Sequence, residues 1–252
     1  MPADKDAVGA VPNTIPSNSD HTDRPFIKFL VINFFEKALN RGLFFSIGMF
    51  INRVIPERVF RFRVFDLFLL KSLEPKPDSE FQFHACETDS DFEMAKQVTK
   101  SAISNKLVEE GLVEAMFLKE QGKPVSGLWL ANRKFFEPEF GIEIQLPEDS
   151  RWIFAAYTDT AYRRRGLYRT LMSQTMNYGE AANKRFFVCV NPCNRPSLIA
   201  HKKSAAQEMG RCYVMRIFGF GFCLPLGGPT VDRYFGTSVL KNPIKLFIES
   251  AE

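Results

Sequence analysis

The sequence lacks an uninterrupted apolar run of membrane-spanning length and a secretory leader. Residues 26–35 contain Lys28 and residues 42–55 contain Arg53, so neither stretch reaches the roughly 18 apolar residues that a spanning helix needs. The first twenty residues carry acids and prolines instead of a basic start followed by an apolar segment. We therefore expect neither a membrane span nor a signal peptide.

A disulfide framework, a zinc pattern and a strong positive charge are absent as well. The five cysteines are odd in number and irregularly spaced, which fits a reducing compartment. Cys189 and Cys193 with the nearby His201 match no zinc-binding spacing. A net charge of +4 is too small to indicate nucleic acid, and no nucleic-acid-binding motif is present. We expect a cytoplasmic protein with no metal ion and no nucleic-acid partner.

Phenylalanine is abundant, with 26 residues in a chain of 252, and many lie in the first third. A hydrophobic content of 45% is enough for a sizeable core. Residues 1–24 read as a flexible tail. Residues 25–78 are predicted to form an aromatic-rich helical extension, with helices at 26–40 and 43–54. An alternating pattern follows at Phe60, Phe62 and Val64 before the sequence turns helical or irregular.

The charge of this extension leaves two interpretations open. Residues 25–71 contain eight Lys and Arg but only three Asp and Glu, in a segment rich in aromatic residues. Such a segment can rest on an anionic membrane surface, which would place a cytoplasmic protein at the membrane. Alternatively, its helices pack on the rest of the protein and the basic side chains are solvated.

A regular alternation of helices and strands follows a proline-containing linker at residues 75–77. Residues 79–225 are predicted to form one α/β domain with a mixed central sheet flanked by helices, and residues 226–252 a C-terminal extension. Thr88 is the expected N-cap of the first helix. The predicted strands are 81–85, 112–119, 125–132, 140–146, 151–158, 185–190 and 212–218, and the predicted helices are 88–100, 102–111, 165–180 and 196–209.

An arginine-rich turn, AYRRRGLYRTL at Ala161 to Leu171, follows the apolar strand 151–158. A helix that begins near Gly166 leaves its first backbone amides unpaired, and such a turn binds anions. Gly166 permits a positive φ or a close approach. Three arginines add charge that can pair with phosphate oxygens. The alternative is a basic helix start with solvated arginines.

This segment resembles the acyl-CoA signature of the GNAT superfamily of acetyltransferases, which is Arg or Gln, two residues, Gly, one residue, then Gly or Ala. Arg163 and Gly166 match this pattern, and Tyr168 departs from it at the final position. The resemblance implies acetyl-CoA, or another acyl-CoA, as co-substrate. The residues implied to hold its pyrophosphate are Thr158, Arg163, Arg164, Arg165, Gly166, Leu167 and Tyr168.

A second motif lies thirty residues further on. The segment NRPSLIAHKK resembles the family's Asn, two residues, Ala or Ser, three residues, Tyr, one residue, Lys. Asn194 and Ser197 fall on this spacing, and His201 stands in place of the Tyr. The resemblance implies that Asn194 and Ser197 hold the pantetheine arm. It also implies that His201 protonates the leaving thiolate, since an imidazolium with a pKa of about 6.5 can donate a proton at neutral pH. The alternative is that His201 is a surface residue of the helix with no catalytic role.

The resemblance further implies that strands 151–158 and 185–190 splay apart around the thioester while an amine attacks directly. A backbone N–H near Ala156 or Tyr157 would then polarise the thioester carbonyl. No carboxylate lies within strand 151–158. Glu143 and Glu114 are therefore the candidate bases, although each also reads as an ordinary surface acid.

The leading hypothesis is transfer of an acetyl group from acetyl-CoA to an amine of a small-molecule acceptor. One alternative is transfer of a longer acyl chain from acyl-CoA or acyl carrier protein, with the phenylalanine-rich region as an apolar wall. Another is a non-catalytic acyl-CoA-binding module. No motif identifies the acceptor.

Overall fold

The structure is a computed structural model that describes residues 43–57, 59–74, 80–237 and 243–248. The chain divides between Phe50 and Ile51 into two units, and α2 (Leu43–Val54) spans the division. The predicted helix at 43–54 is thus confirmed, whereas the tail 1–24 and the predicted helix 26–40 lie outside the described residues. No helix in these described ranges is long and apolar enough to cross a membrane.

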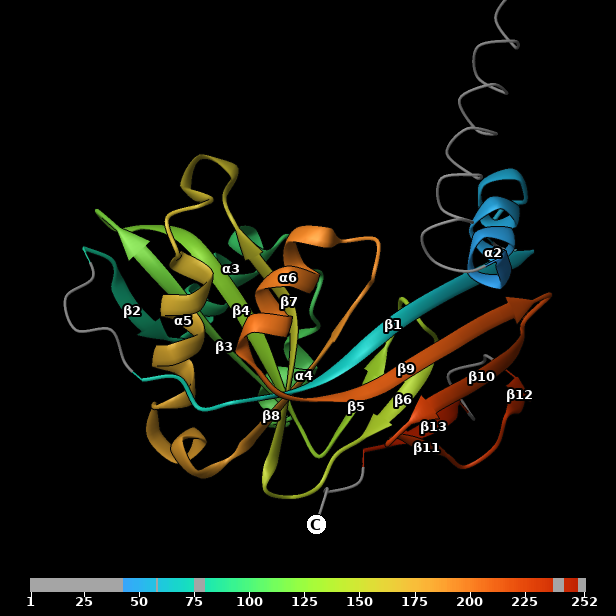
Figure 1. Ribbon diagram of the computed structural model, residues 1–252. Helices are drawn as coiled ribbons and strands as arrows, with labels where there is room; N and C mark the ends of the chain where they lie inside the picture. Colours follow the sequence, from blue (N-terminus) through green and yellow to red (C-terminus); the bar gives the residue numbers. More distant parts are fainter. Residues whose placement is uncertain (1–42, 58, 75–79, 238–242, 249–252) are drawn as a thin grey trace, which may run out of the picture. The chain divides into compact units, whose positions relative to one another are not determined.

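The unit that begins at Ile51 is built on a mixed sheet of nine described strands (Figure 1). Neighbouring strands run antiparallel except β7 and β8, which are parallel. From one edge to the other the strands are β12 (Phe235–Thr237), β10 (Phe220–Gly227), β9 (Ala205–Ile217), β1 (Phe60–Leu70), β8 (Arg185–Val190), β7 (Ser150–Thr158), β4 (Lys123–Asn132), β3 (Val113–Glu120) and β2 (Gln82–Ala85).

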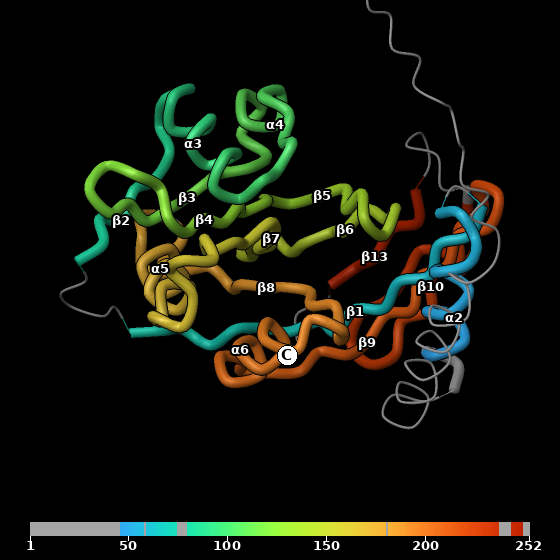
Figure 2. The backbone as a smooth tube through the Cα atoms, turned by 90° about the horizontal axis from the view of Figure 1, so that it is seen from above, coloured from blue at the N-terminus to red at the C-terminus, as the bar shows by residue number. Residues whose placement is uncertain are grey.

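Helices cover both faces of this sheet (Figure 2). On one face, α3 (Asp89–Thr99) and α4 (Asn105–Glu109) pack on a core that includes Trp129. On the other, α5 (Leu167–Met176) and α6 (Arg195–Ser204) pack on a separate core that includes Leu171. We call these the α3 face and the α5 face. The predicted α/β fold with a mixed sheet flanked by helices is confirmed.

A second, smaller sheet lies on the α3 face. Its described strands, in spatial order, are β11 (Thr230–Val231), β13 (Ile244–Phe247), β6 (Ile142–Gln145) and β5 (Lys134–Glu137). Ile142 and Leu246 belong to the same apolar core as Trp129, so the small sheet and the large sheet share one hydrophobic interior.

The prediction of a helical extension is wrong for Phe60–Leu70, which form β1 in the middle of the large sheet. Phe65, Leu67 and Phe68 are fully buried. A strand covered on both faces is apolar at successive positions, so the period-two alternation that marks a half-exposed strand disappears. The boundaries at residues 79 and 225 stay predictions, although β1 lies before the first and β13 after the second.

The predicted helix 196–209 is also wrong at its end, because α6 stops at Ser204 and β9 begins at Ala205. The residues AAQEM have good helix propensity, but they are held as a strand by pairing with β1. Gly210 lies within this strand, where an added Cβ would be 2.2 Å from the carbonyl oxygen of Leu226. Tertiary pairing therefore overrides local propensity here.

Candidate functional site

The arginine-rich turn joins the end of β7 to the start of α5. Asp159 accepts a hydrogen bond of 3.0 Å from the backbone of Ala161 and so starts a short 3₁₀ turn. Arg164 and Gly166 then adopt positive φ angles of 67° and 81°. Gly166 is the N-cap residue of α5 and provides no side-chain cap. The turn therefore brings the uncapped first amides of α5 to the carboxyl end of β7.

The space in front of these amides is open. A Cβ added to Gly166 would meet no atom within 4 Å, and the first turn of α5 holds no acidic residue. Unpaired amides and the positive end of the helix dipole favour an anion at such a position. The geometry therefore fits a phosphate or pyrophosphate group.

The three arginines of the turn do not act together. Arg165 pairs with Glu80 and lies 3.7 Å from Glu120, and its guanidinium also stacks over the rings of Phe81 and Tyr162. Its charge is therefore neutralised on the side of the protein, away from a ligand at Gly166. Of the three arginines, Arg165 is the one whose charge is paired with acidic side chains.

Arg163 instead folds back on the end of β7. Its Nε donates a hydrogen bond of 3.1 Å to the Thr158 carbonyl, and its guanidinium lies 5.3 Å from the centroid of the Tyr157 ring. Arg164 is exposed. These two arginines retain the predicted position beside the strand end and the helix start.

β7 and β8 separate just before this turn. The last paired residues are Ile153 and Val188. On the other side of β7, the register with β4 shifts between Gly127 and Trp129, and Ala155 adopts a positive φ of 47°. This is a β-bulge, a device that bends a strand and redirects its groups. We call the opening beyond Ile153 and Val188 the β7–β8 gap.

The residues of β7 after the bulge lie along the gap. Ala156 is exposed. Tyr157 pairs with Gly127, over which Val98 of α3 packs closely, so Tyr157 lies on the α3 face. Lys100 lies 4.7 Å from the Tyr157 ring centroid, and its hydrogen bond lowers the pKa of the Tyr157 hydroxyl. Sequence reasoning did not identify Lys100, which follows α3 and has no motif around it.

The second predicted motif lies at the start of α6. The Asn194 side chain caps this helix by accepting a hydrogen bond of 3.3 Å from the backbone of Ser197. Its carbonyl oxygen thus accepts one bond within the helix start, and its amide nitrogen is oriented by this contact. Thr158, from the first motif, contacts the Ser126 hydroxyl at 2.8 Å.

His201 is buried, with 4% of its surface exposed. Its Nδ1 lies 2.7 Å from the carbonyl oxygen of Ser197, which can only accept, so Nδ1 carries the proton. Its Nε2 then accepts a hydrogen bond of 2.6 Å from the Tyr168 hydroxyl. Burial lowers the pKa of His201. This environment favours neutral imidazole, and the role of His201 as a proton donor stays a prediction.

Tyr168, the departure from the family pattern, thus turns toward α6 and away from the open space at Gly166. Burial raises the pKa of its hydroxyl, which stays protonated. The bulky side chain at this position is accommodated between the two helices of the α5 face. It leaves the approach to the first amides of α5 open.

The two candidate bases do not reach the β7–β8 gap. Glu143 pairs with Phe136 on the face of the small sheet opposite the buried Ile142, and it accepts a hydrogen bond from Gln145. Glu114 accepts one of 3.1 Å from Asn132, near the end of β4 that pairs with the start of β7. The contacts of both carboxylates are thus made elsewhere, and a role for either as the base stays a prediction. Glu137 of β5, which sequence reasoning missed, lies at the gap instead.

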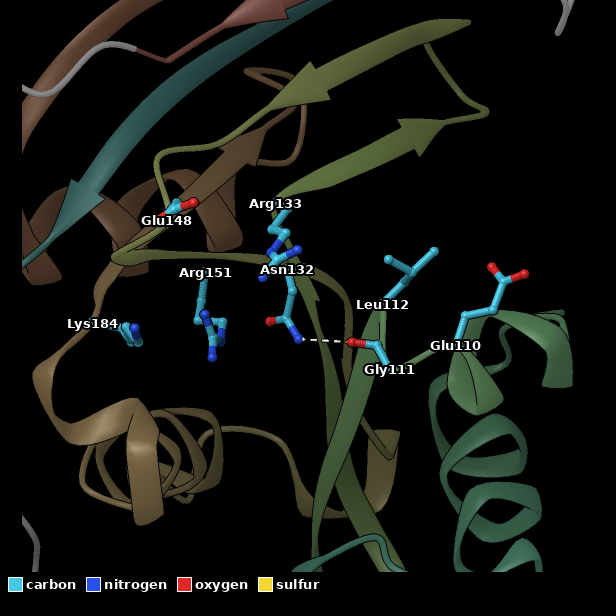
Figure 3. Close-up of a pocket in the computed structure, with 8 residues that line it drawn as sticks. All are labelled: Glu110, Gly111, Leu112, Asn132, Arg133, Glu148, Arg151 and Lys184. Carbon is cyan, nitrogen blue, oxygen red and sulfur yellow. Dashed lines mark hydrogen bonds between the residues drawn. The ribbon is translucent and has the colours of Figure 1, made fainter.

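A cavity of about 470 Å³ lies near the beginning of β7, at the end away from the arginine-rich turn (Figure 3). Figure 3 shows Arg151 and Lys184 on one side of it and Glu110 on the other. It mixes acidic and basic side chains, so it favours no single charge of ligand, and it contains none of the predicted site residues. Its lining residues are Glu110, Gly111, Leu112, Asn132, Arg133, Glu148, Arg151 and Lys184.

No protein-family model and no curated protein matches the sequence. Solved structures to which the chain is similar include a GCN5-related N-acetyltransferase from Kribbella flavida, with 10% identity, a TM-score of 0.43 and coverage of 69% of this chain and 63% of that one. Another is an aminoglycoside antibiotic 6'-N-acetyltransferase from Acinetobacter haemolyticus, with 15% identity, a TM-score of 0.39 and coverage of 50% and 91%.

A third similar structure is an aminoglycoside acetyltransferase from an uncultured soil metagenomic sample in complex with sisomicin, with 12% identity, a TM-score of 0.38 and coverage of 49% and 86%. The chain spans less than two thirds of the length of the Kribbella protein. At such low identities and TM-scores, the function of this chain has to be inferred from its own residues.

Proposed function

We propose that the chain is an acyltransferase that moves an acetyl group from acetyl-CoA to an amine of a small-molecule acceptor. One observation carries this proposal: the open, uncapped N-terminus of α5 stands at the end of the same strand that separates from β8. A phosphate-bearing donor held at Gly166 can thereby extend its thioester into the β7–β8 gap.

The chain's own groups suit such a donor. The first amides of α5, with Arg163 and Arg164 beside them, would hold the pyrophosphate. A backbone N–H of Ala156 or Tyr157, after the bulge, would stabilise the charge that develops on the carbonyl oxygen. Holding the acceptor and the thioester together in the gap supplies a large further part of the rate.

Direct attack by the amine is favoured over a covalent thiol intermediate. The cysteine at the gap is Cys189 of β8, next to the last paired residue Val188. Burial raises the pKa of the Cys189 thiol well above its ordinary value. Because the thiolate is the nucleophilic form, this cysteine is a poor nucleophile.

A thermal-shift assay with CoA, acetyl-CoA and longer acyl-CoAs tests the proposal, together with mass spectrometry of products formed from a panel of primary amines. Mass spectrometry is preferable to a thiol reagent because the chain itself contains free cysteines. A ligand at a hundred times its Kd stabilises a protein by about 2.7 kcal/mol. No shift with any of these compounds would refute the proposal, and turnover only with long acyl chains would replace acetyl as the transferred group.

A non-catalytic acyl-CoA-binding module is the second candidate. It is favoured by one observation: the buried, neutral His201 stands where the resemblance places a proton-donating tyrosine. A CoA-dependent thermal shift without an acylated product from any amine would support this module over the enzyme.

A further inference from the structure

Glu137 ends β5 and lies over the β7–β8 gap. Phe135, two residues before it, packs on Phe154 of β7 with ring centroids 4.1 Å apart. Phe140, three residues after it, packs on Phe65 of β1 with centroids 4.4 Å apart. Because β8 lies between β7 and β1 in the sheet, the chain between these two contacts passes over β8.

The Glu137 side chain faces the large sheet. It stands opposite Ile142 of β6, which is buried in the shared core, and directly opposed residues in a pair of strands project to the same face. Burial raises the pKa of Cys189, the first residue of β8 beyond the pair Ile153 and Val188, and the charges of Glu137 and Glu139 add to this rise. The carboxyl group is therefore held at the mouth of the gap.

The groups around Glu137 leave its carboxyl uncompensated. Burial raises the pKa of Glu137 to about 7, assisted by the nearby Glu139 carboxylate and opposed by a hydrogen bond of 3.2 Å from the Glu139 backbone. Arg63 of β1 lies 3.5 Å from Glu139, and Arg61 donates to the carbonyls of Pro138 and Glu139. Among the described residues, Glu137 forms no ion pair with a basic side chain.

Building on the acyl transfer proposed above, we propose that Glu137 is the general base that takes the proton from the acceptor ammonium. The proton passes from R–NH₃⁺ to the Glu137 carboxylate. The free amine nitrogen then forms a bond to the thioester carbonyl carbon, and the carbon–sulfur bond breaks. The sulfur leaves with the second proton of the nitrogen, and Glu137 returns its proton to water.

This assignment places the donor and the acceptor on opposite faces of the sheet. Tyr162, Leu167 and Tyr168 of the turn and α5 pack on the α5 face, whereas Glu137 and the small sheet lie on the α3 face. The gap joins the two faces. The acceptor amine would therefore approach from the α3 face, where Glu137 is held beside the packed rings of Phe135 and Phe154.

The test compares Glu137→Gln with Glu139→Gln, a matched control one turn away on the same hairpin. With the best amine found for the wild type, Glu137→Gln should lower kcat/KM at neutral pH by about 100-fold or more, the range of general-base catalysis. Its pH profile should also lose the acidic limb. Glu139→Gln should stay within about threefold of the wild type and keep that limb.

A second comparison separates proton removal from structural damage. Hydroxylamine, which is already neutral at the assay pH, should lose less than about tenfold with Glu137→Gln, because no ammonium proton has to be removed. Glu137→Asp, which keeps a carboxylate with a shorter reach, should restore part of the activity and of the acidic limb.

The outcomes distinguish this inference from the proposed function. If Glu137→Gln keeps the activity and pH profile of the wild type, Glu137 is not the base, while acyl transfer stands. An equal loss with hydroxylamine and with alkylamines also overturns it. The CoA-induced thermal shifts of Glu137→Gln and Glu139→Gln should both match that of the wild type. If the wild type shows neither a CoA shift nor product, the proposed function fails and this inference fails with it.

Discussion

The Tyr168 hydroxyl donates a hydrogen bond of 2.6 Å to Nε2 of His201 and so joins α5 to α6. Because His201 is buried and its other nitrogen is engaged, removing this donor leaves Nε2 without a partner. Tyr168→Phe should therefore lower the free energy of unfolding by about 1–3 kcal/mol. Urea unfolding at pH 7.5 measures this change. Tyr162→Phe, which removes a bond to the partly exposed Glu120, should cost less. Equal losses would contradict the burial argument.

Gly166 allows the positive φ that starts α5, and Gly179 has a similar conformation with open space around it. Replacing either by alanine should cost about 1–2 kcal/mol of stability, because a Cβ strains the left-handed conformation. Only Gly166→Ala should also reduce the CoA-induced thermal shift, since only Gly166 lies at the proposed phosphate site. A reduced shift in both variants would mean that the loss reflects general destabilisation.

Arg163 and Arg165 should contribute differently to CoA binding, because their side chains have different partners. Arg163→Ala should weaken CoA binding by about tenfold at low salt, since a charge-assisted bond to phosphate contributes on the order of 1.5 kcal/mol. The difference should shrink as added salt screens the charge. Arg165→Ala should leave CoA binding within about twofold because its guanidinium is held by Glu80. Calorimetric titration at two salt concentrations checks both, and the reverse order would mean that Arg165 is the phosphate ligand.

Glu137 should make the folded protein less stable as the pH rises. Its carboxyl has a pKa of about 7 in the folded state against an ordinary value of 4.5. Between these values the folded state keeps a proton that the unfolded state has lost. The free energy of unfolding therefore falls as the pH rises from 4.5 to about 7. Glu137→Gln should gain stability relative to the wild type on the order of 3 kcal/mol at pH 8 and little at pH 4. Urea unfolding across this range tests it, and a gain independent of pH would contradict it.

Much of the fold was predictable because most strands and helices carry local signals. Thr88 caps α3 as its sequence indicates, and Asp91 completes a reciprocal capping box. The strand β1 was missed because it is buried on both faces and loses its alternation. The end of α6 was misplaced because the start of β9 is fixed by pairing with β1, which is distant in sequence.

The donor half of the candidate site was more predictable than the acceptor half. The turn at Gly166 has its signal within a few residues, and the structure places an open helix N-terminus there. Glu137 has no motif around it. It reaches the β7–β8 gap only because the contacts of Phe135 and Phe140 carry its hairpin across the sheet. Long-range packing of this kind leaves no local pattern in a single sequence.

Ala155 gives the β7 bulge its unusual backbone, with a φ of 47°. Non-glycine residues in this region are strained by about 1 kcal/mol or more, and such strain gathers at functional sites. Ala155→Gly should relieve the strain while adding entropy to the unfolded chain, so the net change in stability should stay within about 1 kcal/mol. Ala155→Val should destabilise by more than about 1 kcal/mol, because a β-branched side chain disfavours this conformation more strongly.

Catalytic activity should depend on the backbone conformation of the bulge at Ala155. Because a backbone N–H of Ala156 or Tyr157, just after the bulge, is the proposed oxyanion donor, Ala155→Val should lower kcat by about 10-fold or more, the effect of misplacing such a donor. CoA binding at the arginine-rich turn should change little, since that turn lies beyond the strand. Ala155→Gly should keep kcat within about threefold. Equal kcat in all three proteins would show that the bulge shapes the strand without serving the transfer step.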